Sequence, residues 1–327
     1  MLKSCRYLGL STVLAVSVCH SANGLETDQL LGWGVELEDS ATALNEFVNG
    51  EIDGLLAKLA RKGRTPACED VTKKVYKRVF PSLLRPRIRR RLIRDYAIDR
   101  YPGEDVGYFE HLKSSIYRKP AFPFILPLCR TMRVGDVYLG TDKLGHFFGQ
   151  GRRYYKRYLK EREAGASELD AVTATVRKGV KLEATVVGGL VDGVFSHADL
   201  EANYQGMLLA RSFCEGPDPV LVRTSAGWAR GHDVDMRAFV NPAFDESYNT
   251  SSFKASRWKR VRPVIEAEYC PRIADDDVLQ RYRRYDELDA ESFSRRLIRE
   301  EYQSQGRHVQ AEYSVAAVCA TTTAALR

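Results

Sequence analysis

Apolar residues recur every three or four positions in several long stretches of the chain, and shorter stretches rich in proline and glycine separate them. After Asp39 and Ser40, which are good helix caps, the apolar positions fall on one helical face: Leu44, Phe47, Val48, Ile52, Leu55, Leu56 and Leu59. Gly63 follows as a stop signal. The pattern predicts a helix between these signals.

The same spacing predicts a second helix near residues 71–80, a third near 88–96 and a short one near 108–116. Pro81 and Pro86 separate the second from the third. Arginines surround the third helix: Arg85, Arg87, Arg89, Arg90, Arg91 and Arg94. They form either a solvated face paired with acids or a surface for anionic lipid or phosphate.

Three successive helical stretches follow, at residues 143–160, 168–189 and 197–212. If their connections are short, the three helices run up, down and up. The first and third are then parallel, and both begin at the same end of the bundle.

The remainder of the chain is less regular. Prolines and glycines predict a loop-rich part at 213–274 with a few short strands, and a charged helix follows at about 275–303. The small, apolar tail from Val315 is expected to be loosely ordered. We therefore expect a mainly α protein, with residues 25–327 in one domain and a helical core at about 135–212.

The first 24 residues have the pattern of a secretory signal. A positively charged start precedes an apolar run from Leu8 to Val18, which is too short to span a bilayer, and small residues precede Leu25. Export with cleavage before Leu25 is the expectation, and a lipoprotein signal acylated at Cys19 is the alternative. We therefore expect an exported protein that is located in a bacterial periplasm or cell envelope.

Composition adds little to the choice of partner. Hydrophobic residues make up 44% of the 327 positions and charged residues 28%, as in folded globular proteins. The formal charge of +7 is modest for this length. It is compatible with an anionic lipid or cell-wall glycan ligand and with peripheral membrane contact, and we expect no nucleic-acid partner. The most apolar later stretch, Val180 to Phe195, carries charges that make a membrane span unfavourable.

Five cysteines remain after the signal: Cys68, Cys129, Cys214, Cys270 and Cys319. In an oxidising compartment, two disulfides and one further thiol are the simplest arrangement. Pairing of neighbours would join Cys68 to Cys129 and Cys214 to Cys270, although the other connectivities stay open. The cysteine and histidine spacing is not that of a structural zinc site.

Reactive residue types gather in two short stretches. If the first is helical, Asp142 and His146 lie one turn apart on one face. In the second, Asp199, Asn203 and Gly206 share a face, and Gly206 would let another helix approach closely. The parallel arrangement of their helices would bring both stretches to the same end of the bundle.

Two helix starts side by side would favour an anion. In this interpretation Lys143 and His146 contact the anion, and Asp142 sets the tautomer of the histidine. Asp199 and Asn203 complete the polar floor, and Ser196 is a further candidate ligand-binding residue.

The two stretches together resemble the signature of VanZ-like proteins and the related YfiM-type envelope lipoproteins. The matching residues are Asp142, Lys143, Gly145 and His146, followed by Ser196, Asp199, Ala202, Asn203 and Gly206. The resemblance covers roughly residues 135–210 and implies a bacterial envelope protein with a small helical core. It implies no settled reaction.

Two alternatives stay open. The protein can be a hydrolase with His146 as general base and Asp142 as its orienting partner, while His197 and Asp199 supply an acid or metal ligands. No cofactor is required, but His146, His197 and Asp199 are the candidate ligands if a divalent metal binds. Otherwise the same residues are structural: Ser196 caps a helix with Asp199 at its third position, Thr141 or Asp142 caps another, and His146 belongs to the core.

Overall fold

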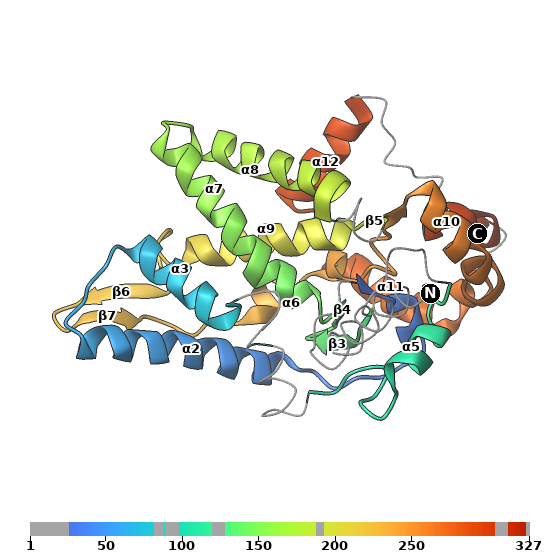
Figure 1. Cartoon of the computed structure of the whole chain (residues 1–327), viewed down its shortest axis with the longest axis horizontal. Helices are drawn as coiled ribbons and strands as arrows, with labels where there is room; N and C mark the ends of the chain where they lie inside the picture. The colour runs from blue at the N-terminus through green and yellow to red at the C-terminus, as the bar shows by residue number, and fades with distance from the viewer. Residues whose placement is uncertain are drawn as a thin grey trace, which may run out of the picture.

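The computed structural model describes residues 26–81, 88, 98–119, 128–187, 193–304 and 313–324. This part of the chain is mainly α, as the sequence predicts (Figure 1). Its α-helices are α2 (Ala41–Arg61), α3 (Cys68–Val79), α5 (Tyr108–Ser114), α6 (Lys143–Gly145), α7 (Gly151–Glu163), α8 (Glu168–Leu182), α9 (His197–Ser212), α10 (Ala255–Val264), α11 (Asp276–Leu288), α12 (Phe293–Ser304) and α13 (Val315–Ala324).

The strands are short and occur in separate pairs. The parallel pair joins β1 (Glu26–Thr27) to β2 (Leu128–Cys129). The antiparallel pairs are β3 (Thr131–Val134) with β4 (Val137–Gly140), β5 (Val194–Phe195) with β8 (Ser252–Phe253), and β6 (Leu221–Thr224) with β7 (Gly227–Arg230). The β6–β7 hairpin lies along α2 (Figure 1).

The three helices predicted in the middle of the chain are present. α6 passes through one π-helical turn, η2 (His146–Gln150), into α7, and α8 ends in a second π-helical turn, η3 (Glu183–Val187). Helix α7 packs against both α8 and α9 (Figure 1). Lys143 contacts Asp199, and further along Tyr158 contacts Glu215, so α6–α7 and α9 run parallel as expected.

The close approach expected at Gly206 is also present. A Cβ atom at Gly206 would overlap the carbonyl oxygen of Phe147, and a Cβ at Gly151 would lie only 2.8 Å from the Cα of Gly206. The carbonyl of Gly206 accepts a hydrogen bond of 2.6 Å from the Tyr76 hydroxyl. Glycine at both crossing positions therefore sets the distance between the helices that carry the two motifs.

Within the described residues, the buried hydrophobic side chains form two clusters. The larger one is formed by α2, α3, the α6–α9 helices and the loops that follow. The smaller one gathers Trp33, Trp258, Tyr269 and residues of α13 around the C-terminal part. None of the helices in the described ranges combines the length and the apolar character that a bilayer span requires.

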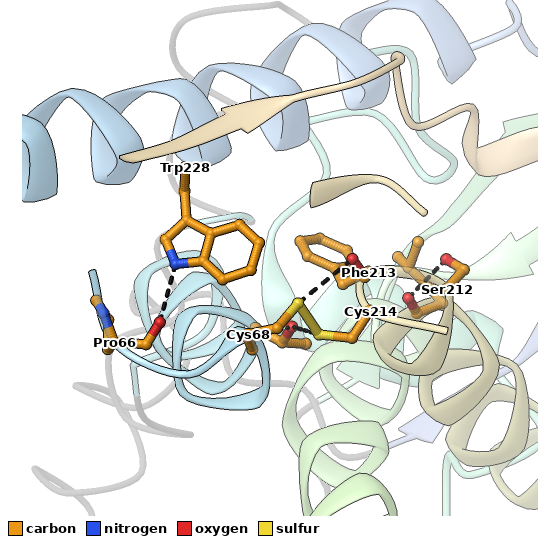
Figure 2. Close-up of a disulfide and its surroundings, with 8 residues drawn as sticks. Pro66, Cys68, Ser212, Phe213, Cys214 and Trp228 are labelled. Atoms are coloured by element: carbon orange, nitrogen blue, oxygen red, sulfur yellow. Dashed lines mark hydrogen bonds between the residues drawn. A yellow bond between two sulfur atoms is a disulfide. The ribbon is translucent and has the colours of Figure 1, made fainter. Parts of the chain in front are cut away.

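The disulfides differ from the pairing of sequence neighbours. Cys68 pairs with Cys214, and Cys270 pairs with Cys319, whereas Cys129 is buried outside both. Figure 2 shows that Cys68, at the start of α3, meets Cys214 just beyond the end of α9. The nearby indole of Trp228 donates a hydrogen bond of 2.9 Å to the carbonyl of Pro66. The packing of α3 on α9, which sequence order does not reveal, brings the two cysteines together.

The C-terminal part is more ordered than expected. The loop-rich part at 213–274 includes the helix α10. Residues 275–303 form two helices, α11 and α12, instead of one. The chain is extended at Asp289, where α11 ends, and the Ser292 hydroxyl accepts a hydrogen bond from the Arg295 amide at the start of α12. The tail from Val315 is helical, since the disulfide at Cys319 fixes it against the smaller cluster.

Two sequence expectations lie outside the described residues. They are the signal at 1–24, including Cys19, and the arginine-surrounded helix near 88–96, of which the structure describes only Ile88.

Candidate functional site

A fully buried lysine lies at the centre of the two motifs. The Nζ atom of Lys143 is 2.6 Å from Asp142 Oδ2, 2.7 Å from Asp199 Oδ1 and 3.0 Å from Glu246 Oε1. The lysine side chain is 0% exposed. An ammonium group without water requires such partners, because an unpaired buried charge is very unfavourable.

Four separate regions of the chain supply this ion network. Asp142 and Lys143 follow β4 after one residue, Thr141, and Asp199 lies in the first turn of α9. Glu246 comes just after the 3-10 turn η5 (Pro242–Phe244), and its amide donates to the side chain of Gln29. Thr27 of β1 donates a hydrogen bond of 2.5 Å to Asp142 Oδ1.

Burial and charge oppose one another at these groups. Burial alone would raise the pKa of Asp142, but the charge and hydrogen bond of Lys143 outweigh it and lower that pKa. Burial would lower the pKa of Lys143, but the surrounding carboxylates raise it well above its ordinary value. At Glu246, burial dominates over the attraction of Lys143, and the neighbouring carboxylates add to it, so its pKa rises to about 7.

His146 connects this network to the protein surface. Its Nε2 atom is 3.1 Å from Asp199 Oδ2, and its Nδ1 atom is 3.2 Å from Asn203 Oδ1. The side chain of His146 is 14% exposed, against 3% for that of Asp199. His146 also begins the π-helical turn η2. A π turn changes the direction of the side chains that follow, and such turns are frequent at functional sites.

A small polar pocket lies beside His146. Its lining comes from η2, α7, the end of α8 and α9: His146, Gln150, Tyr154, Gly179, Leu182, Glu183 and Asn203. About 10 Å³ is open to the centre of a water molecule, which is room for roughly one water. A Cβ at Gly179 would overlap the Tyr154 hydroxyl, so glycine makes room for this hydroxyl at the pocket wall.

The structure brings together Asp142, Lys143, His146, Ser196, Asp199 and Asn203 from the sequence-derived set. Ser196 is an N-cap, as the structural interpretation expects, because its hydroxyl accepts from the Asp199 amide at 3.0 Å. The same hydroxyl donates to Glu246 Oε1 at 2.5 Å. The side chain of Asp142, in contrast, caps no helix and is bound to Lys143 and Thr27.

The position of Lys143 does not agree with contact to an external anion. Its ammonium is enclosed, and the anionic group near the start of α9 is the protein's own Glu246.

His197 does not join the other residues. Its ring packs edge-on against Phe195 with 5.1 Å between centroids. Burial and the charge of Arg295 lower its pKa to about 4, so the ring is neutral near pH 7. Among the residues that the structure describes, the group able to share a metal is instead Asp142, His146 and Asp199, each with one ligand atom within 4.8 Å of the others.

Glu246, Thr27 and Glu183 are the residues that sequence reasoning missed. Glu183 Oε1 accepts from the Ser196 amide at 3.2 Å, and it also lines the pocket. Glu183 is one of several charged residues in an otherwise apolar stretch, and this unusual composition is a signal that the sequence does contain. Thr27 and Glu246 lie in segments whose sequence has no helical or strand pattern, so they give no such signal. Only the tertiary fold identifies them.

Comparisons with known proteins add no relative. No protein-family description matches the chain, and no curated protein or solved structure is significantly similar to it.

Proposed function

We propose that this chain is an exported cell-envelope protein that binds an anionic lipid- or glycan-linked ligand at the His146 pocket. The observation that carries the proposal is the position of His146, the member of the buried ion network that borders the pocket. The network fixes the ring, and most of the residues that line the pocket beside it are polar.

The proposed location draws on two observations. Two disulfides fit an oxidising compartment, and the first 24 residues have the pattern of a secretory signal. The resemblance of the two motifs to those of VanZ-like envelope proteins supports the same location. N-terminal sequencing of the exported protein tests it, with Leu25 as the expected first residue.

The pocket has room for a single hydroxyl group of such a ligand. Asn203, Gln150 and Tyr154 offer amide and hydroxyl groups there. The carboxylates behind His146 outnumber Lys143 three to one, so an anionic group would be repelled from the pocket floor.

The anionic part of the ligand is proposed to bind outside, at the pocket rim. Arg153 is exposed and lies 3.3 Å from the side-chain oxygen of Gln150, a pocket residue. Lys178 is also exposed and precedes the pocket residue Leu182 by one turn of α8. Two cations on adjacent helices give a phosphate or carboxylate partners in water, where the desolvation cost is small.

Binding assays test this proposal. The mature chain would be titrated with soluble peptidoglycan fragments in one arm, and with phosphatidylcholine vesicles with or without phosphatidylglycerol in the other. His146→Ala and Arg153→Ala should each weaken binding by about tenfold, which corresponds to roughly 1.4 kcal/mol. The exposed His232→Ala serves as the control.

The arm in which binding occurs identifies the source of the ligand. Thermal unfolding of His146→Ala near the wild-type temperature would confirm that the variant is folded. Absence of binding in both arms, or equal binding by all variants, would contradict the proposal.

A hydrolase is the second candidate, favoured by the contact between His146 and Asp199. Both ring nitrogens face protein partners, so Nδ1 can accept a proton only after a substrate displaces Asn203. Chromatography of the peptidoglycan fragments after incubation distinguishes the two functions, because a hydrolase converts them to smaller products and a binding protein leaves them intact.

A further inference from the structure

The buried group behind the pocket has more negative than positive charge. Asp142, Asp199 and Glu246 surround the single ammonium of Lys143. The three acidic side chains therefore outnumber the one basic side chain that they contact. Such an excess in a buried site favours a further cation.

The atoms that would receive this cation already face one another. His146 Nε2 and Asp199 Oδ2 are 3.1 Å apart, and Asp142 supplies a third ligand atom within 4.8 Å of both partners. Ligands on one ion with bonds of about 2.1 Å are separated by roughly 3–4 Å. The His146–Asp199 pair therefore fits one edge of a coordination shell, and Asp142 would move slightly inward.

The pocket provides an independent sign of a missing partner. The hydroxyl of Tyr154, which lines the pocket, is almost completely buried and has no aligned hydrogen bond within the described ranges. The amide of Asn203 is its polar neighbour. A buried hydroxyl normally has a partner, and a water molecule in this pocket, held by an ion at His146, would provide one.

We propose that Asp142, His146 and Asp199 bind one divalent first-row metal ion, such as Zn²⁺ or Mn²⁺, at the inner wall of the pocket. One imidazole and two carboxylates form a ligand set that these ions accept. His146, one of the three ligands, lines the pocket, from which water or a ligand hydroxyl would reach the ion. This inference does not depend on the identity of the proposed lipid or glycan ligand.

Calorimetric titration of metal-stripped mature protein with ZnCl₂, and separately with MnCl₂, tests the proposal with the metal alone. We expect one site per chain for at least one of the two ions. His146→Ala and Asp199→Asn should weaken its binding by at least tenfold.

His197→Ala is the matched control, because His197 is a histidine of the same region that lies outside the ligand group. This variant should keep the wild-type affinity. Absence of a bound ion in the wild type, or loss of binding in His197→Ala with retention in His146→Ala, would overturn the proposal.

Thermal unfolding with and without the metal guards against misfolded variants. The metal should raise the unfolding temperature of the wild type and of His197→Ala. His146→Ala should unfold cooperatively at a temperature that the metal does not change. If His146→Ala unfolds cooperatively and the metal raises its unfolding temperature as much as that of the wild type, the assignment is contradicted.

Discussion

The Nζ atom of Lys143 lies 2.7 Å from Oδ1 of Asp199, on a side chain whose other oxygen faces His146. The buried lysine therefore holds the carboxylate of Asp199 in place, and Asp199 in turn holds the imidazole at the pocket wall. The order of these groups, from buried cation to carboxylate to partly exposed ring, is the basis of the function proposed above.

Removal of the buried ammonium should be strongly destabilising. Lys143→Met would leave three carboxylates close together without a cation, and loss of one partner of a buried ion pair costs about 3–5 kcal/mol. Chemical denaturation measures the loss, with the exposed Lys160→Met as a control expected to change stability by less than about 0.5 kcal/mol. Equal effects of the two substitutions would mean that the network contributes little.

The helix crossing gives a second prediction. Gly206→Ala would force its Cβ into the backbone of Phe147, and overpacking of this kind costs about 1–3 kcal/mol or more. Gly50 is the control, because nothing lies within 4 Å of a Cβ at this position in α2. Gly50→Ala should raise stability by about 0.5–1 kcal/mol. Similar unfolding temperatures for both variants would contradict the close approach of the helices.

Peptide mapping without reduction should recover Cys68 linked to Cys214 and Cys270 linked to Cys319. Replacement of both Cys68 and Cys214 by serine should cost about 2–5 kcal/mol, since this bridge closes a long loop. Recovery of a peptide that joins Cys68 to Cys129 would contradict this pairing and would favour bridges between cysteines that are neighbours in the sequence.

Asp28 should make stability depend on pH. Burial raises its pKa to about 7, against the opposing effect of hydrogen bonds from the amides of Ile116 and Leu30. Between about pH 4 and pH 7 the carboxyl of Asp28 is therefore protonated in the folded state but ionised in the unfolded state. The stabilisation that this proton provides is complete below about pH 4 and is lost as the pH rises towards 7.

Comparison with Asp28→Asn isolates this contribution. The quantity to compare is the free energy of unfolding of the wild type minus that of the variant. This difference should be about 2–3 kcal/mol larger at pH 5 than at pH 8, because one pKa unit corresponds to roughly 1.4 kcal/mol. A difference that does not change with pH would show that Asp28 has an ordinary pKa.

Local spacing predicted the helices and much of the site, because one helical turn fixes the relation of Asp142 to His146 and of Asp199 to Asn203. The up-down-up order of α7, α8 and α9 then placed the two motifs together. The predicted contact of Lys143 with an external anion failed, because the burial of a side chain depends on what covers it, and here Glu246 from a distant loop does so.

Other features depend on tertiary packing that no local pattern encodes. The disulfide at Cys214 follows from the contact of α3 with the end of α9, and the ordered tail follows from the bond at Cys319. Residues without a periodic context, such as Thr27 and Glu246, could be found only after the fold was known.

The most direct test of the central claim is the response of the pocket's own side chains to a ligand. In a nuclear magnetic resonance titration of the mature chain with peptidoglycan fragments or anionic lipid headgroups, the side-chain amides of Asn203 and Gln150 and the ring of His146 should shift together and saturate. The ring of His197, which packs against Phe195 outside the pocket, should not shift. A saturable response elsewhere on the protein, with these pocket signals unchanged, would contradict a binding site at His146.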